Sequence, residues 1–310
     1  MKISFVIPVF NEENSLAILH KEILENINSY SYEIIFIDDG STDKSYEIIK
    51  DISRKDKNVK AIKFRRNFGK ADALQAGFSY VTGDVVFTMD ADLQDNPIEI
   101  PRFINEIING YDLVSGWKKK RHDPLSKKIP SKIFNFITSK AVGLKLKDFN
   151  CGFKAYKAQV VKELDIYGDM HRYIPALAFA KGFKIKEIVV EHRERKFGKS
   201  KYGIERYLRG FFDLLTVKLI TGFTRSPLYL FGKIGLFFGG IGFVITSYLS
   251  YLKIFENASL SNRPMLSLGV LLILAGLQFF SIGLIGELLV NQTRKHNKQT
   301  NVSIEDKINI

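Results

Sequence analysis

Two aspartates that follow a buried strand are the residues whose types and spacing most directly indicate chemistry. The apolar run 85–88 leads into Met89-Asp90-Ala91-Asp92-Leu93-Gln94, which places two carboxylates at i and i+2 and an amide two residues later. In an open α/β sheet, ligands bind beyond the carboxyl ends of the strands. A hard cation such as Mg²⁺ or Mn²⁺ takes a few carboxylate oxygens from the protein and keeps other positions for substrate phosphates. This turn therefore predicts a divalent cation at the rim of a sheet.

Acidic residues also follow two other strands. Glu12 comes shortly after the run 2–9, and Asp39 follows the run 33–37 in the turn Asp38-Asp39-Gly40-Ser41. A local interpretation is available for each, since acids complement the dipole at a helix start and Ser41 suits the N-cap of a helix over 43–52. The recurrence of acidic turns at strand ends favours ligand binding instead.

Strands and helices alternate along most of the chain. The segments expected as strands are 2–9, 33–37, 59–64, 85–88, 111–116 and 185–191. Those expected as helices are 16–27, 43–52, 71–81, 97–109 and 174–181. This alternation predicts an α/β fold with a doubly wound, mainly parallel sheet.

The charge balance points to anionic partners. The 310 residues carry a formal net charge of +13, which suits phosphate ligands, nucleic acid or a membrane face. Nucleic acid is not expected, because the basic excess lies next to apolar segments. The single cysteine, Cys151, allows no disulfide within the chain and suits a reducing compartment. The N-terminus begins with a strand pattern, so no signal peptide is expected.

Two apolar segments, 228–252 and 265–285, are each long enough to cross a hydrocarbon core of ~30 Å, which takes about 20 residues. The link between them carries one base, Arg263, whereas bases flank the pair on both outer sides. The positive-inside rule therefore predicts a multi-pass protein of the cell membrane with the N-terminal domain and both termini in the cytoplasm. Gly235 and Gly239 form a small-xxx-small pair, which leaves a homo-oligomer open.

The expected domains follow from these patterns. Residues 1–225 form a cytoplasmic catalytic domain, 226–291 a two-helix transmembrane region and 292–310 a cytoplasmic tail. Within the first domain, 129–142 and 205–223 can form amphipathic helices. The basic stretch 118–132 suggests that these helices lie in a membrane interface, although helices that pack on a core would show the same pattern.

Six motifs together resemble the GT-A glycosyltransferases of family 2. More narrowly, they resemble the membrane-anchored polyprenyl-phosphate glycosyltransferases, the group of dolichyl-phosphate mannose synthase and the bactoprenyl glucosyl- and aminoarabinosyltransferases. The motifs are Val6–Glu12, Asp38–Asp43, Asn67–Lys70, Asp90–Gln94, Asp148–Phe153 and Arg195–Lys201. Their order and spacing agree over nearly the whole chain, including the two apolar spans. The resemblance implies the GT-A fold, which is a Rossmann-like sheet domain.

The resemblance also implies residue roles. The nucleotide sugar would be held by Pro8, Phe10, Glu12, Asp39, Lys70, Asp90 and Ala91. The Mg²⁺ or Mn²⁺ ion would be bound by Asp92 and Gln94. Asp90, Asp92 and Asp148 would be catalytic, with Asp148 organising the acceptor site. The acceptor phosphate or the diphosphate would contact Lys118, Arg195 and Lys201. In this chain Phe10 replaces the usual tyrosine and Lys118 the usual arginine.

The implied reaction is an inverting transfer of a sugar from a UDP- or GDP-linked donor to a polyprenyl phosphate, undecaprenyl or dolichyl, which gives a lipid-linked monosaccharide. A phosphate monoester is mostly dianionic at neutral pH, so its oxygen needs no general base.

Four alternatives use the same fold or the same acids. A different membrane acceptor stays open. A nucleotidyltransferase would carry a basic, glycine-rich loop after the first strand, which 8–14 does not offer. A processive polysaccharide synthase would need a Gln-x-x-Arg-Trp segment, but the only tryptophan, Trp117, follows Gly116. The intact acids Asp90 and Asp92 argue against a non-catalytic domain.

Overall fold

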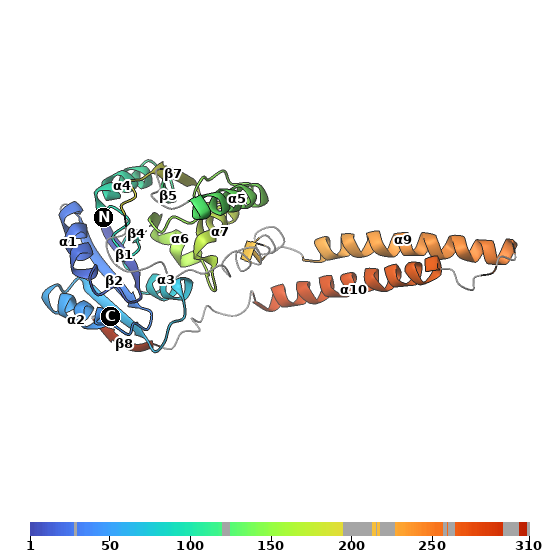
Figure 1. Ribbon diagram of the computed structural model, residues 1–310, viewed down its shortest axis with the longest axis horizontal. Coiled ribbons are helices and arrows are strands. Elements are labelled where there is room, and N and C mark those ends of the chain that lie inside the picture. The colour runs from blue at the N-terminus through green and yellow to red at the C-terminus, as the bar shows by residue number, and fades with distance from the viewer. Residues whose placement is uncertain are drawn as a thin grey trace. The chain divides into compact units, whose positions relative to one another are not determined.

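The computed structural model describes residues 1–27, 30–119, 125–194, 213–214, 216–217, 227–256, 259, 264–293 and 304–308 (Figure 1). The chain divides into two compact units, one of residues 1–218 and 298–310 and the other of residues 219–297.

The first unit contains one sheet and the helices that pack on it. Its strands are β1 (Lys2–Val9), β2 (Ser31–Asp38), β3 (Val59–Phe64), β4 (Val85–Thr88), β5 (Leu113–Trp117), β6 (Lys154–Lys157), β7 (Ile185–Val189) and β8 (Ile304–Ile308). Its helices are α1 (Leu16–Asn26), α2 (Ser45–Lys55), α3 (Lys70–Phe78), the 3-10 helix η1 (Pro97–Glu99), α4 (Ile100–Ile108), α5 (Leu125–Val142), α6 (Ala158–Glu163), the 3-10 helix η2 (Met170–Tyr173) and α7 (Ile174–Ala180).

The strand order in the described sheet is β7-β5-β6-β4-β1-β2-β3-β8. Strands β4, β1, β2 and β3 are parallel neighbours, which confirms the predicted α/β fold with a mainly parallel sheet. Two strands were not predicted, and both run antiparallel. β6 lies between β4 and β5, and β8 pairs with β3. Because each is short and pairs with strands far away in the sequence, neither has a local apolar pattern that would reveal it.

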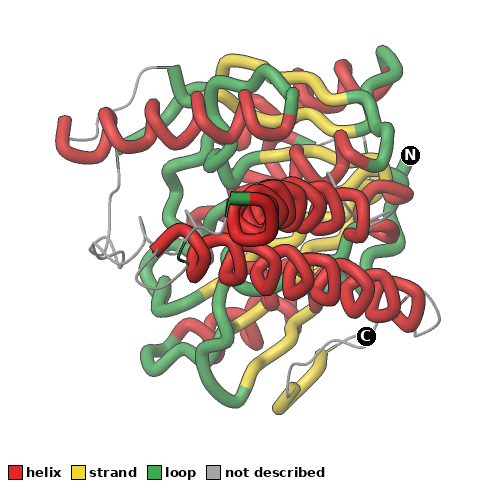
Figure 2. The backbone as a smooth tube through the Cα atoms, turned by 90° about the vertical axis from the view of Figure 1, so that its right-hand side faces the viewer, coloured by secondary structure: helices red, strands yellow, loops and turns green. Residues whose placement is uncertain are grey.

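Helices cover both faces of the sheet (Figure 2). Side chains alternate between the faces of a strand. On one face, Phe5 of β1 and Phe36 of β2 belong to the core that contains the apolar side of α1. On the other face, Gly77 of α3 lies directly against Val6 and Ile37. The close approach of α3 depends on that glycine, because a Cβ there would stand 2.4 Å from Val6 Cγ1.

Several local predictions need correction or refinement. The prediction that Ser41 caps a helix was wrong, since α2 begins at Ser45 after Lys44. Ser41 instead accepts a hydrogen bond from the Asn11 N–H through its Oγ, at 2.9 Å, and so joins two loops. The helix expected from residue 97 begins as η1, with Asn96 as its cap, and continues as α4. The amphipathic helix expected over 129–142 lies within α5, whereas the one expected over 205–223 falls almost entirely outside the described residues.

The second unit is a hairpin of two long helices, α9 (Pro227–Phe255) and α10 (Pro264–Thr293). Both are long and apolar enough to cross a membrane, as the two predicted spans require. Glycines allow the helices to approach, since a Cβ on Gly235 would lie 2.6 Å from the Gly276 carbonyl oxygen, and one on Gly242 would lie 2.6 Å from that of Gly269. Gly235 therefore packs the two helices of one chain together and carries no argument for an oligomer.

A buried carboxylate holds together the strand ends that lie away from the predicted site. Glu33 of β2 is 2 % exposed and forms ion pairs with Lys60 at 2.8 Å and with Lys2 at 3.4 Å. Thr82 also donates a backbone hydrogen bond to it, at 2.6 Å. Burial raises the pKa of Glu33, but hydrogen bonds from Lys60, Ser4 and Thr82 outweigh burial and hold the pKa at about 2.

We expect Glu33→Gln to lower the free energy of unfolding by about 3 kcal/mol at pH 7, because the variant removes the buried charge of an ion pair and leaves the partly buried ammonium of Lys60 without its counter-charge. An acid with a lowered folded pKa adds stability above its unfolded pKa, and that stability is lost as the pH falls. The difference between wild type and variant should therefore narrow as the pH drops from 4.5 toward 2. Thermal unfolding of both proteins in detergent measures this difference in stability. Equal midpoints for wild type and Glu33→Gln at pH 7 would contradict the prediction.

Candidate active site

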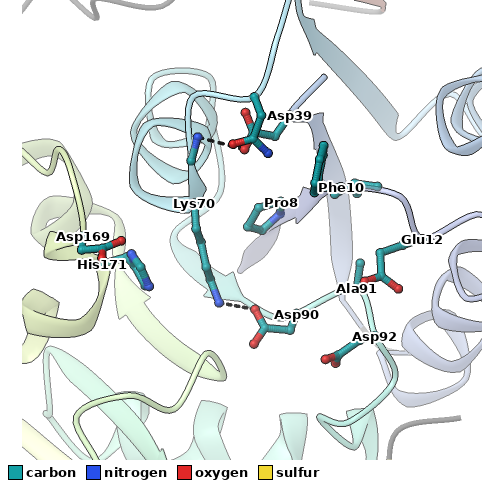
Figure 3. Close-up of a pocket in the computed structure, with 13 residues that line it drawn as sticks. Pro8, Phe10, Glu12, Asp39, Lys70, Asp90, Ala91, Asp92, Asp169 and His171 are labelled. Atoms are coloured by element: carbon teal, nitrogen blue, oxygen red, sulfur yellow. Dashed lines mark hydrogen bonds and ion pairs between the residues drawn. The ribbon is translucent and has the colours of Figure 1, made fainter. Parts of the chain in front are cut away.

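A cavity of about 460 Å³ opens where β1, β2 and β4 end (Figure 3). Its walls come from loops that follow these three strands, from the start of α3 and from η2. The lining residues are Pro8, Val9, Phe10, Glu12, Asp39, Asn67, Gly69, Lys70, Asp90, Ala91, Asp92, Asp169 and His171. All seven residues predicted to bind a nucleotide sugar are thus gathered around one cavity, at the carboxyl edge of the sheet where open α/β folds bind ligands.

The loop after β1 is fixed by hydrogen bonds to the loop after β2. Asn11 has φ of 55°, in the left-handed region that non-glycine residues seldom adopt. Its side-chain oxygen accepts the Thr42 N–H at 2.8 Å. The next residue, Glu12, donates its own N–H to Ser45 Oγ at 2.8 Å. This bracing sets Phe10 and Glu12 at the cavity wall.

Asp39 joins β2 to the start of α3. Its carboxylate accepts the Phe68 N–H at 2.7 Å and the Gly69 N–H at 2.9 Å, and it is 4 % exposed. Burial raises the pKa of Asp39 to about 6, although the two backbone donors oppose that rise. The pKa of this carboxylate therefore lies close to neutral pH, and Asp39 lines the cavity.

Lys70, the first residue of α3, reaches across the cavity to the carboxylate of Asp90 (Figure 3). Burial alone would raise the pKa of Asp90, but the ammonium groups of Lys70 and Lys118 hold it well below its usual range. The backbone of Gly152 lies against the same carboxylate, since a Cβ there would stand 2.5 Å from Asp90 Oδ2. Thr88 donates a hydrogen bond to the Gly152 carbonyl at 2.8 Å and so holds that backbone in place.

Asp92 lies in the cavity wall two residues farther on and is 8 % exposed. Its Oδ1 accepts the backbone N–H of Gln94 at 3.2 Å, and the residue between them, Leu93, has φ of 63°. Gln94 does not line the cavity, and its carbonyl accepts the Arg193 N–H at 3.0 Å.

The donor set fits a hard divalent cation. Asp90 and Asp92 bring carboxylate oxygens to one turn at the cavity wall. Among the described residues, no cluster of three or more His, Cys, Asp or Glu side chains could enclose an ion by itself. An ion at this turn would therefore take few protein ligands and complete its shell with phosphate oxygens, as Mg²⁺ does at phosphate sites.

Two residues predicted for the acceptor site support the cavity instead of lining it. Lys118 is 11 % exposed and forms an ion pair with Asp95 at 2.8 Å. Asp95 in turn accepts the Asp90 N–H at 3.2 Å, so this pair braces the acidic turn. Asp148 is fully buried and accepts the Asn150 N–H at 3.1 Å. Arg195 and Lys201, the other predicted acceptor contacts, lie outside the described residues.

The wall formed by η2 was missed in the sequence. Asp169 and His171 line the cavity on the far side of Lys70 from Pro8 and Phe10 (Figure 3). Arg172 lies 3.3 Å from Asp169 and anchors this wall. Burial and the nearby cation Lys70 keep the pKa of His171 well below its usual value, so its imidazole is neutral. The only local indication of this wall in the sequence was a cluster of polar residues just before the apolar helix α7.

Comparison with known proteins agrees with this geometry. Residues 4–165 match the family described as Glycosyl transferase family 2. A dodecaprenyl-phosphate galacturonate synthase of Rhizobium johnstonii is 36 % identical over 296 residues, which cover 93 % of this chain and 88 % of the relative. An undecaprenyl-phosphate 4-deoxy-4-formamido-L-arabinose transferase of Photorhabdus laumondii is 38 % identical over 290 residues, which cover 92 % of this chain and 88 % of the relative.

A solved structure shares the fold. It is the glucosyl-3-phosphoglycerate synthase of Mycobacterium tuberculosis in complex with Mn²⁺, UDP and phosphoglyceric acid. The TM-score is 0.54 at 17 % identity, over 71 % of this chain and 78 % of that one. The GT-A fold that the motifs implied is therefore confirmed. Because the family match covers more than half of the chain and its acidic motifs meet at one cavity, the chain belongs to the family 2 glycosyltransferases.

Proposed function

We propose that this enzyme transfers a sugar from a nucleotide-sugar donor to a polyprenyl phosphate, with inversion at the anomeric carbon, and so makes a lipid-linked monosaccharide. The observation that carries the proposal is the similarity over 93 % of the chain to an enzyme named for a dodecaprenyl-phosphate product. Because the span covers 93 % of the chain, it takes in most of the helical hairpin as well as of the domain that contains the cavity. A second relative is named for undecaprenyl phosphate, so the acceptor class recurs while the sugar differs.

In this proposal the cavity divides along its length. Pro8, Phe10 and Asp39 hold the nucleoside, and Glu12 adds an acceptor for hydroxyl or base donors. Lys70, Asp90 and Ala91 lie where the diphosphate must pass. The η2 wall with His171 is then left for the transferred sugar, because it stands across Lys70 from the nucleoside end (Figure 3).

The Mg²⁺ or Mn²⁺ ion would be held by the carboxylate of Asp92, next to that of Asp90. Gln94, the second ligand proposed from the sequence, does not line the cavity and would have to turn toward it. When bound, it supplies Lewis-acid stabilisation of the charge that develops on the diphosphate. The protein's own part is to keep the acidic turn in place through Leu93 and through the pair of Lys118 with Asp95.

The chemical step is a single displacement. A lipid phosphate oxygen forms a bond to C1 of the sugar as the bond from C1 to the diphosphate oxygen breaks, and the nucleoside diphosphate leaves with that electron pair. The attacking phosphate is already largely dianionic at neutral pH, so no protein base has to remove a proton. Arg195 and Lys201 are proposed to offset the repulsion between the two anionic substrates. Asp148 and Lys118, which do not line the cavity, are proposed to position the residues of the acceptor site.

The acceptor dictates where the enzyme works. A polyprenyl tail is costly to withdraw from a bilayer, at ~0.8 kcal/mol per CH₂. The helices α9 and α10 are apolar enough to anchor the enzyme there. The bases Arg225, Arg294 and Lys295 outside the hairpin support a topology with the catalytic unit and both termini in the cytoplasm.

One assay tests the proposal. Membranes that contain the enzyme are supplied with undecaprenyl or dolichyl phosphate and with a panel of radiolabelled UDP- and GDP-sugars, and label is extracted into organic solvent. We expect label from one donor to enter the organic phase only when a divalent cation is present. No labelled lipid from any donor with either acceptor would overturn the proposal.

Donor binding is expected to depend on pH through Asp39. Below a pKa of about 6 this carboxyl takes up a proton and loses acceptor capacity. If only the ionised form binds, the KM for the donor should rise about tenfold between pH 7 and pH 5. The nucleotide sugar itself does not titrate in this range. In Asp39→Asn the KM should be high and independent of pH; a KM equal to that of wild type would contradict the role.

A further inference from the structure

Lys70 places a positive charge at the same acidic turn that would bind the divalent cation. Its ammonium forms an ion pair with Asp90, and both groups are partly shielded, with side chains 21 % and 31 % exposed. Asp92 lines the same cavity two residues away. The acidic turn that fits a divalent ion is therefore already neutralised in part by the protein's own side chain.

This lysine is poorly explained as a stabiliser of its own helix. It is the first residue of α3, directly after the N-cap Gly69. The N-terminus of a helix carries partial positive charge, so a basic residue there is unfavourable. Gly69 also has φ of 104°, a conformation that lets the chain turn so that Lys70 points across the cavity. The position makes sense through Asp90 rather than through the helix.

We infer that Lys70 and the divalent cation are alternative counter-charges for the turn that carries Asp90 and Asp92. Without nucleotide, the ammonium group offsets the negative charge of the turn and repels an arriving divalent ion. When a diphosphate enters with the ion, it adds negative charge that can satisfy both cations, and Lys70 moves from Asp90 to a phosphate oxygen. The metal and the nucleotide then bind cooperatively, and the empty enzyme holds the metal weakly. This inference rests on the metal site of the proposed function.

The test is Mn²⁺ binding by the full-length enzyme in detergent with no donor or acceptor, followed by the electron paramagnetic resonance signal of free Mn²⁺. We expect Lys70→Met to bind Mn²⁺ about tenfold more tightly than wild type, because removing one positive charge beside a divalent ion gains that much even under water-like screening. Lys70→Arg keeps the charge and should stay close to wild type. UDP binding at saturating Mn²⁺ should be weaker in Lys70→Met.

Lys157→Met is the matched control. Lys157 also pairs with an aspartate, Asp112, at 2.8 Å on the same sheet, but it does not line the cavity. Its loss should leave the Mn²⁺ affinity unchanged. An Mn²⁺ affinity of Lys70→Met equal to or below that of wild type overturns the inference, as does a failure of both proteins to bind Mn²⁺. If Lys70→Met binds UDP as tightly as wild type at saturating Mn²⁺, the proposed contact of Lys70 with a phosphate oxygen is wrong. None of these outcomes needs transfer activity, so failure of the glycolipid assay is a separate result.

Discussion

Asp92→Asn is expected to lower kcat/KM for sugar transfer by about a thousandfold, which corresponds to the several kcal/mol that a bound metal ion can contribute. The substitution removes one negative charge and almost no volume. The amide oxygen can still accept the Gln94 N–H that Asp92 Oδ1 accepts at 3.2 Å, so the loop should keep its shape. What is lost is the charge that draws a divalent ion to this part of the cavity wall.

The measurement is initial transfer rate at saturating Mn²⁺, with the thermal midpoint recorded for the same samples. Asp112→Asn provides the control, because it makes the same change at an aspartate that pairs with Lys157 and does not line the cavity. It should keep its transfer rate even if its midpoint falls. Substantial activity in Asp92→Asn at saturating Mn²⁺, with an intact fold, would show that Asp92 is not a ligand of the metal. Asp92→Ala is expected to be equally inactive.

The features that sequence alone predicted are those written in local patterns. Apolar runs of strand length, each followed by an acidic turn, were enough to place Glu12, Asp39 and Asp90 at one edge of a parallel sheet, and all three line the cavity. The two apolar spans were equally plain, because the length and composition of α9 and α10 are local properties. Family motifs then added roles that geometry alone does not assign.

The features that sequence missed depend on contacts between distant segments. β6 has only four residues and fits between β4 and β5 through pairing that no local period encodes. A motif also does not show which groups are already engaged. Lys118 was predicted to contact substrate, yet its ammonium pairs with Asp95 at 2.8 Å. His171 reaches the cavity on a short 3-10 helix, where polar residues just before α7 were the only local indication of a ligand site.

The carboxyls of Glu33 and Asp39 lie at opposite ends of β2 and have opposite effects on stability. Glu33 has a pKa of about 2, so its ionised form stabilises the fold and that stability is lost in acid. Asp39 has a pKa of about 6, so its ionised form costs stability, which returns as the pH falls below 6. The first carboxyl pairs with two lysines, whereas the second is held by backbone N–H groups beside the cavity. The end of the strand that carries the destabilising carboxylate is the end that lines the cavity.

Gly152→Ala is expected to reduce transfer by about a hundredfold while the protein stays folded, the scale of loss that follows a misplacement of about 1 Å at a reacting site. A Cβ on Gly152 would stand 2.5 Å from Asp90 Oδ2 and 2.8 Å from Asp90 Cγ, so the carboxylate has to move. The contacted group is the end of a side chain, which can move more easily than backbone. The movement would break the ion pair with Lys70 and shift the acidic turn's charge inside the cavity.

Gly240→Ala is the matched control, because a Cβ at Gly240 meets nothing within 4 Å. It should keep both its transfer rate and its thermal midpoint. Kinetics at saturating donor separate the two effects expected of Gly152→Ala, since a displaced Asp90 should raise the KM for the donor as well as lower kcat. Gly152→Ser should be at least as damaging, because it adds a hydroxyl to the same Cβ. Wild-type kinetics in Gly152→Ala would mean that catalysis does not use the Asp90 carboxylate in the position it has against Gly152.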